Sequence, residues 1–373
     1  MIQWPRLWAV ARKEALQLRR DPRSLILAFG LPVILLLLFG YAITWDVTQI
    51  PTAVVDQDRT AASRALIDAF RASGYFRVVE RPQRADAIGT LFDRDRVQIA
   101  LIIPPDYAAR LGSGRPAQLQ AIVDGSDANT ATIILNYTQA IVQNRAQAVV
   151  LPGRTPGAPV TAASRAWYNE TLASRNMIVP GLVAVIMMII AAMLTSLTIA
   201  REWERGTMEQ LAATPVTRAE VVLGKLTPYV AIGMIDVGTS SLLGVGLFGV
   251  PFRGNPALLI VLSFFFLVGA LGLGLFISAV TRSQLLATQL AMVATFLPAY
   301  LLSGFMFAIS VMPQPLRLLT YLIPARYFLV VTRGIFLKGV GLEVLFIPGL
   351  FMLAFAVVGL LLAMHAFKKE VVA

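Results

Sequence analysis

Long apolar runs constrain the fold of this chain more than any other feature. The first run, SLILAFGLPVILLLLFGYAIT at 24–44, has 21 residues and no charge. About 20 helical residues cross the roughly 30 Å of hydrocarbon in a bilayer, so this run is predicted to span a membrane. It is too long for the core of a signal peptide, and no small-x-small cleavage site follows it directly. Charged residues make up only 14% of the 373 positions, which also indicates lipid as the solvent.

Five further runs of this kind follow, so the predicted fold class is an α-helical polytopic membrane protein with six transmembrane helices. An even number of spans puts both termini on one side of the membrane. Six bases in 1–23, and two lysines in the tail 367–373, place that side in the cytoplasm. The net charge of +11 then reflects membrane topology, and no nucleic-acid partner is expected. The spans are predicted at 24–44, 177–199, 226–249, 257–280, 285–308 and 344–366.

Two segments are predicted to lie at the membrane surface. In 1–23, apolar residues recur at helical spacing with bases on the other face, which is typical of an interfacial amphipathic helix. Residues 309–343 contain three prolines, and the apolar piece 325–337 has only 13 residues, two of them arginines. This segment is predicted to form two short re-entrant or interfacial helices on the outer side. The apolar face of the first segment comprises Trp4, Leu7, Trp8, Ala11, Ala15 and Leu18.

Residues 45–175 are predicted to form an extracytoplasmic α/β domain between spans one and two. Acids and bases are mixed there, and short alternating runs that predict strands are interleaved with helical patterns. Long loops and domains translocate regardless of their charge, so its bases do not contradict this placement. A loop rich in Pro and Gly is expected at 151–159. Strands are predicted at 51–56, 97–103 and 117–123, and helices at 63–73 and 127–150.

The polar segment 200–225 lies between spans two and three and faces the cytoplasm in this topology. Capping boxes at 207–210 and 217–220 predict a helix, a turn and a second helix. The first helix is expected to end before Pro215, and Gly206 is expected to let the backbone turn ahead of it. These features alone favour a well-capped, solvated loop over a functional element.

The same segment resembles a known family signature. REWERGTMEQLAATPVTRAEVVLGK at 201–225 resembles the signature of ABC-2 type permeases, the membrane subunits of ATP-binding-cassette transporters. A second motif at 303–339, which begins SGFMF, resembles the C-terminal part of drug-export members of that family. The resemblance implies a coupling helix at about 207–214 that docks on an ATPase subunit. The coupling residues that it implies are Glu202, Glu204, Arg205, Gly206, Thr207, Met208, Glu209, Leu211, Thr214, Pro215, Gly224 and Lys225.

The resemblance implies the permease subunit of an ABC exporter in the bacterial inner membrane, which moves an amphipathic or hydrophobic, drug-like substrate outward. The chain contains no G-x-x-x-x-G-K-[ST] phosphate loop, so ATP and magnesium are expected on separate ATPase subunits. No cofactor, metal site or catalytic activity is expected in the chain itself. Six spans are too few for a full pathway in this family, which implies a homodimer or a heterodimer with a related permease. The outer domain is a candidate receptor for substrate or for a periplasmic adaptor.

Asp236 supports a competing hypothesis, because it is the only acid well inside a predicted span. Intramembrane acids are costly and usually functional, so a proton-coupled secondary transporter would use this group. The structural alternative is a carboxylate that accepts hydrogen bonds from the hydroxyls at 239–241. A third hypothesis is a non-transporting scaffold that passes ATPase motion to the outer domain. The five glycines within 233–249 are expected to permit close helix packing. The candidates for a translocation path are Asp236, Phe296, Tyr300, Phe305 and Met306.

Overall fold

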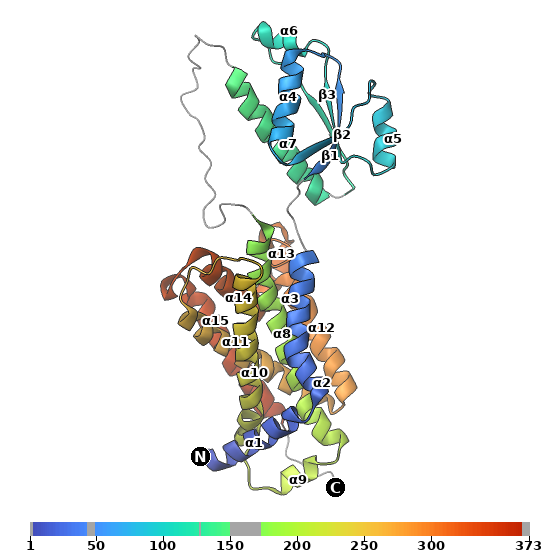
Figure 1. Ribbon diagram of the computed structural model, residues 1–373. Coiled ribbons are helices and arrows are strands. Elements are labelled where there is room, and N and C mark those ends of the chain that lie inside the picture. The colour runs from blue at the N-terminus through green and yellow to red at the C-terminus, as the bar shows by residue number, and fades with distance from the viewer. Residues whose placement is uncertain (1–2, 43–48, 127, 150–172, 368–373) are drawn as a thin grey trace. The chain divides into compact units, whose positions relative to one another are not determined.

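A computed structural model of the chain describes residues 3–42, 49–126, 128–149 and 173–367. Contacts divide the chain into two compact units (Figure 1). One unit is Thr44–Ser164, and the other combines Met1–Ile43 with Arg165–Ala373. The loop predicted at 151–159 and the two lysines of the predicted tail fall outside the described residues.

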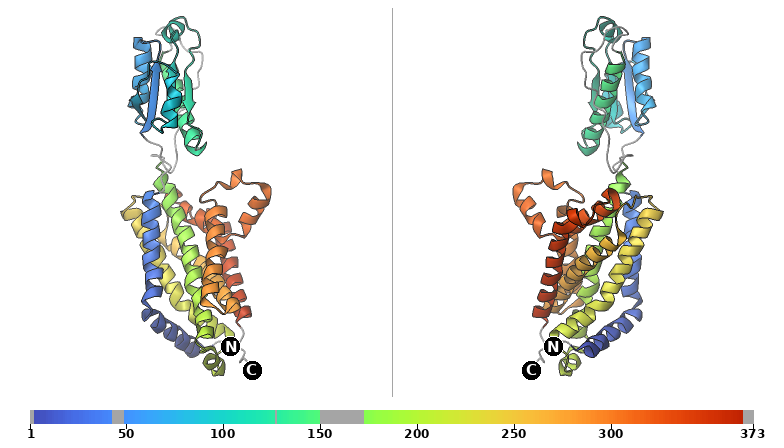
Figure 2. Two further views of the ribbon diagram at one scale, coloured as in Figure 1. Left: turned by 90° about the vertical axis from the view of Figure 1, so that its right-hand side faces the viewer. Right: turned by 90° about the vertical axis from the view of Figure 1, so that its left-hand side faces the viewer.

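The larger unit is built from long apolar helices that run side by side (Figures 1 and 2). Among the described residues, five helices are long and apolar enough to cross a membrane. They cover most of the runs predicted as spans two to six. The five are α8 (Ser174–Glu204), α10 (Arg218–Gly246), α11 (Pro256–Thr281), α12 (Gln284–Leu302) and α15 (Leu342–Ala366).

The run predicted as the first span is helical but less regular. It consists of α2 (Pro22–Leu25), the π-helical turn η1 (Ile26–Gly30) and α3 (Leu31–Ala42). Its apolar part, Ile26–Ala42, is shorter than the about 20 residues that cross a bilayer. A π-helical turn inserts an extra residue into the helical repeat and often marks a functional position.

The fifth predicted span, 285–308, extends too far. The helix α12 ends at Leu302, and Gly304 adopts a left-handed conformation with φ +86°. A left-handed residue breaks the helical repeat, and glycine adopts this conformation without strain because it has no Cβ. Phe305 and Met306 therefore lie in the turn that follows α12 and not within a span.

Between α12 and α15 the chain forms short helices. The stretches Gln314–Leu322 and Pro324–Lys338 meet at an angle of 80°, as in a broken span or a re-entrant loop. Pro324 opens the second stretch, where the missing amide hydrogen costs nothing. The elements are η2 (Ile309–Val311), α13 (Gln314–Leu319), η3 (Thr320–Leu322), α14 (Pro324–Arg333) and η4 (Gly334–Lys338).

Glycines let α11 approach its neighbours closely. A Cβ at Gly272 would lie 2.7 Å from the carbonyl carbon of Gly359 in α15, and one at Gly274 would overlap the Ala192 carbonyl in α8. The expectation that the glycines at 233–249 all serve packing is wrong in part. A Cβ at Gly238, Gly246 or Gly249 would meet nothing within 4 Å, whereas Gly233 and Gly244 do contact neighbouring side chains.

The smaller unit is an α/β fold whose sheet has the order β2-β1-β3-β4. Strand β1 pairs in parallel with both β2 and β3, and β4 runs antiparallel to β3. The strand β2 was missed because it is a five-residue edge strand, FRVVE, whose two adjacent valines interrupt the alternation of apolar and polar residues. The strands are β1 (Ile50–Asp56), β2 (Phe76–Glu80), β3 (Ile99–Ile103) and β4 (Gln120–Val123).

Helices cover both faces of this sheet (Figure 1). Alternation along β1 sends Val54 toward a core that includes Phe70 of α4, and Val55 toward a second core with Ile88 of α5. Buried parallel strands are apolar on both faces for this reason. The helices are α4 (Ala61–Ala72), α5 (Ala87–Asp93), α6 (Tyr107–Gly112) and α7 (Ala128–Val149).

Candidate functional site

The polar segment 200–225 connects the end of α8 to α10 through the short helix α9 (Met208–Ala213). Gly206 makes the turn ahead of α9 with φ +68°, as predicted. Thr214 is extended before Pro215, so α9 ends where the proline predicted. The second predicted capping box is present, since Thr217 and Glu220 exchange hydrogen bonds at the start of α10.

The first predicted capping box is wrong. Thr207 has helical backbone angles and makes no cap hydrogen bond. Its hydroxyl donates instead to the carboxylate of Glu202, one turn back in α8. A buried carboxylate needs hydrogen-bond donors more than a helix end in water does, which accounts for the different partner.

The N-terminal helix α1 (Trp4–Arg19) lies against this segment and against α10. The Gln3 amide donates to Glu220 at 2.7 Å, and Arg6 donates to the Pro215 carbonyl at 2.6 Å. The predicted apolar face of α1 is divided between two environments. Trp4, Trp8 and Ala15 remain exposed, while Leu7, Ala11 and Leu18 pack inward together with Glu14.

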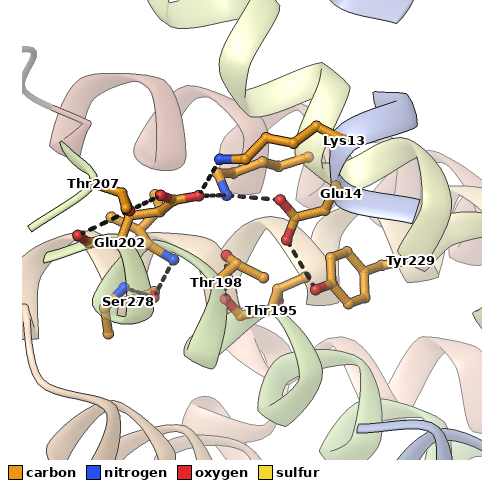
Figure 3. A network of polar contacts seen from close by, with 11 residues as sticks. Lys13, Glu14, Thr195, Thr198, Glu202, Thr207, Tyr229 and Ser278 are labelled. Carbon is orange, nitrogen blue, oxygen red and sulfur yellow. Dashed lines mark hydrogen bonds and ion pairs between the residues drawn. The ribbon is translucent and has the colours of Figure 1, made fainter. Parts of the chain in front are cut away.

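Buried charges join α1, α8 and α10 (Figure 3). Lys225 Nζ lies 2.8 Å from Glu14 Oε2 and 3.3 Å from Glu202 Oε1. Lys13 Nζ reaches the same Glu202 oxygen at 2.7 Å, and the Tyr229 hydroxyl donates to Glu14 at 3.1 Å. The side chains of Lys225 and both glutamates are at most 5% exposed. We call Lys13, Glu14, Glu202, Lys225 and Tyr229 the buried ion cluster.

Further contacts connect the end of α8 to Asp21, the residue before α2, and to the start of α12. Arg201 pairs with Asp21 at 3.0 Å, and Glu204 accepts a hydrogen bond from the Gln284 amide at 2.7 Å. Burial alone would raise the pKa of Asp21. Hydrogen bonds from Ser24 and the charge of Arg201 outweigh burial and hold the pKa of this carboxyl below its ordinary value.

The predicted coupling residues separate into an inward and an outward group. Glu202, Met208 and Lys225 are buried, and Gly224 lies against α1, where a Cβ would be 2.8 Å from Val10. Thr207 and Leu211 are half-buried. The exposed residues form the surface that we call the α9 rim: Glu204, Arg205, Gly206, Glu209, Thr214 and Pro215.

The sequence interpretation missed the contribution of α1. Glu14 and Lys13 belong to the buried ion cluster, and Gln3 and Arg6 hold the second turn. One signal was available. Glu14 is an acid among the bases of α1, and it shares the spacing of the apolar residues that pack inward.

Gly206→Ala isolates the conformational role of the turn. A Cβ at this position would meet nothing within 4 Å, so the cost comes from the left-handed backbone alone. We expect a loss of about 1 kcal/mol in the free energy of unfolding, measured in mixed micelles. Gly206→Asn should lose less, because asparagine tolerates this conformation. Equal losses in the two variants would contradict this explanation.

The translocation candidates lie in two separate places. Phe296, Tyr300 and Phe305 form a chain of ring contacts with centroids 5.4 and 5.8 Å apart, and the Tyr300 hydroxyl lies 3.6 Å from the Met306 sulfur. Asp236 is buried in α10 and shares no hydrogen bond or ring contact with this group. Phe305 is buried against Gly181 of α8.

The hydrogen bonds expected for Asp236 do not form. The Thr239 hydroxyl donates to the main-chain carbonyl of Asp236, and Ser241 Oγ is buried without a partner. Within the described ranges, no hydrogen bond to the Asp236 carboxylate occurs. In the same part of the chain, no group of three or more His, Asp or Glu side chains is arranged to hold a metal ion.

Comparisons with known proteins show which family the chain belongs to. The family model for the ABC-2 family transporter protein matches residues 22–365. The chain is 38% identical to the probable multidrug ABC transporter permease YbhS of Escherichia coli (strain K12), over 96% of this chain and 95% of YbhS. It is 32% identical to YbhR of the same strain, also a probable multidrug ABC transporter permease, over 91% and 92% of the two chains.

A more distant relative is the linearmycin resistance permease protein LnrN of Bacillus subtilis (strain 168). The chain is 25% identical to LnrN, over 83% of this chain and 85% of LnrN. The match to the family model and the two nearly full-length similarities agree with the motifs at 201–225 and 303–339. This chain belongs to the ABC-2 family of transporter proteins.

Proposed function

We propose that the chain is the permease subunit of an ABC exporter and that a separate ATPase subunit docks on the α9 rim. One observation carries this proposal. The α9 rim is an exposed, mainly polar surface, and it lies in the segment that connects Glu202 and Lys225 of the buried ion cluster. Met208 is 2% exposed and anchors α9 from below, so a force on the rim would act on the helix bundle. A solvated loop would need no such anchoring.

The buried ion cluster gives this force a path into the bundle. Glu202 is at the end of α8, Lys225 is near the start of α10, and Glu14 is on α1. Separating buried charges leaves each without its partner, which costs several kcal/mol, so the three helices should move as one body. Closure of the ATPase subunits would then tilt α1, α8 and α10 together and switch the access of the pathway between the two sides.

Assembly and location follow from the same proposal. The chain would sit in the bacterial inner membrane with both termini in the cytoplasm, 24–44 as a sixth span and the α/β unit outside. It would pair with a second copy or with a related permease, as the two similar relatives YbhR and YbhS suggest. ATP and magnesium would stay on the ATPase subunits. A hydrophobic or amphipathic drug-like substrate is in keeping with relatives that are named for multidrug transport and linearmycin resistance. A periplasmic adaptor could meet the α/β unit.

Glu209→Lys tests the docking surface. Glu209 is exposed on α9, so reversing its charge should leave folding unchanged and weaken the attachment of the ATPase. We expect tagged wild-type protein, purified from native membranes, to carry a Walker-type ATPase with substrate-stimulated activity. The variant should lose most of that activity. The matched control is Glu343→Lys, an exposed acid at the start of α15.

Transport assays on the purified protein distinguish this proposal from the competing one, a proton-coupled carrier. Transport by the purified chain without any ATPase would overturn the proposal and favour a proton-coupled carrier. Asp236 would then be the proton site, since its buried carboxylate accepts no hydrogen bond in the described part of the chain. An unchanged ATPase activity in Glu209→Lys would instead exclude the α9 rim as the docking surface.

A further inference from the structure

The α/β unit contains a cavity that the proposed transport function does not use. Its volume is about 510 Å³, and it lies at the carboxyl ends of the parallel strands β1 and β2, beside the first turns of α4. Ligands of open α/β sheets bind outside the carboxyl ends of the strands, so this is the expected position for a site. The apolar part of its lining is formed by Val54, Ile67 and Pro82.

Three arginines line the cavity: Arg59, Arg64 and Arg81. They come from the loop after β1, from α4 and from the residue that follows β2. None of them forms an ion pair within the described residues, whereas their neighbour Arg96 pairs with Glu80 and Arg84 pairs with Asp86. Three guanidinium groups that line one cavity, none of them held in an ion pair among the described residues, favour an anion.

The acids of the lining do not balance these charges. The cavity is lined by two carboxylates, Asp56 and Asp68, against three guanidinium groups. Asp56 is held by the loop and by α4: Oδ1 accepts from the amides of Asp58 and Arg59 at 3.1 and 2.9 Å, and Oδ2 accepts from the Ser63 hydroxyl at 2.8 Å. The lining therefore keeps an excess of positive charge.

The loop that carries Arg59 is held in one conformation. The Thr60 hydroxyl donates to Asp58 and accepts from the Ser63 amide, which closes the capping box of α4. Arg59 itself has φ +53°, a left-handed conformation that costs about 1 kcal/mol for such a residue. These hydrogen bonds fix the backbone from which the Arg59 side chain extends, so the loop itself needs no ordering when a ligand binds.

We propose that this cavity binds a small organic anion, a carboxylate or a phosphate, with its charge on Arg59, Arg64 and Arg81. A short apolar body of the ligand rests against Val54, Ile67 and Pro82. The site is independent of the α9 rim and of ATP hydrolysis, because all of its residues belong to the α/β unit.

The test is a calorimetric titration of the full chain in nanodiscs of phosphatidylcholine, with phenyl phosphate and benzoate as probes. Benzyl alcohol, which has the same ring and no charge, is the negative control. We expect saturable binding of an anionic probe, and a loss of about tenfold in affinity in Arg64→Gln and in Arg59→Gln. The matched control is Arg71→Gln, two turns further along α4 and outside the cavity.

Three results would contradict the proposed anion site. Equal binding of benzyl alcohol, no binding of either anion, or equal losses in Arg71→Gln and Arg64→Gln would each overturn the proposal. Thermal unfolding of each variant serves as the control for folding. We expect the fold to be retained, because these arginines are exposed. Discs that contain phosphatidylglycerol identify the source of the anion. If phosphatidylglycerol in the disc weakens the binding of phenyl phosphate, the site binds a lipid headgroup. If the binding is unchanged, the site binds a dissolved ligand.

Discussion

Replacing Lys225 by methionine should destabilise the protein by about 3–5 kcal/mol, the cost of removing one partner from a buried ion pair. The ammonium group lies between the carboxylates of Glu14 and Glu202, and its side chain is 3% exposed. Without it, the buried Glu14 carboxyl group is left, among the described residues, with the Tyr229 hydroxyl as its single donor. The free energy of unfolding in mixed micelles, followed by tryptophan fluorescence, measures this loss.

Two further variants make the Lys225 experiment specific. Lys13→Met removes a cation from the same Glu202 oxygen, but the Lys13 side chain is 52% exposed, so the loss should stay near or below about 1 kcal/mol. Glu14→Gln combined with Lys225→Met removes the stranded carboxylate together with its cation and should recover part of the stability. If the double variant is no more stable than Lys225→Met, burial of the Glu14 charge is not the cause of the loss.

Gly274→Ala is the second large effect that we expect. The added methyl group would overlap the main-chain carbonyl of Ala192 and the Thr195 hydroxyl, which donates to the Leu271 carbonyl at 2.7 Å. Overpacking costs about 1–3 kcal/mol, and the upper end applies because a backbone atom cannot rotate away. We expect a lower free energy of unfolding in mixed micelles and the loss of this hydrogen bond between α8 and α11.

Gly238→Ala provides the matched control for the packing prediction. Gly238 is also inside a helix, α10, but a Cβ there would meet nothing within 4 Å. Alanine in a helix interior is favoured over glycine by up to about 1 kcal/mol, so this variant should be slightly more stable than the wild type. A loss of similar size in both variants would mean that close contact between α8 and α11 is not what Gly274 serves.

The spans and the turns of the polar segment could be predicted because they depend on local properties. Apolar runs of sufficient length lie in the five long helices, and Gly206, Pro215 and the box at 217–220 act within a few residues of themselves. The end of α12 could not be predicted in this way. The residues after Leu302 stay apolar, and the left-handed Gly304 that ends the helix changes direction without changing hydropathy.

The sequence predicts only part of the candidate site, because some of its residues are brought together over long sequence separations. The family signature contains Glu202 and Lys225, but Glu14, the second carboxylate that pairs with Lys225, is 211 residues away from it in sequence. A pairing over that separation leaves no trace in local periodicity. Thr207 illustrates the same limit, since its sequence context fits a helix cap and its hydroxyl binds a buried carboxylate instead.

The single carboxylate of Glu202 also has a consequence for how such chains diverge. It accepts from Lys13 and Thr207 and pairs with Lys225, so three elements depend on one charge. A substitution at any of these positions changes the number of charges and donors that the others must balance. In an alignment of related permeases, positions 13, 14, 202, 207 and 225 should therefore vary together, and chains that lose the acid at 202 should lose the lysine at 225 as well.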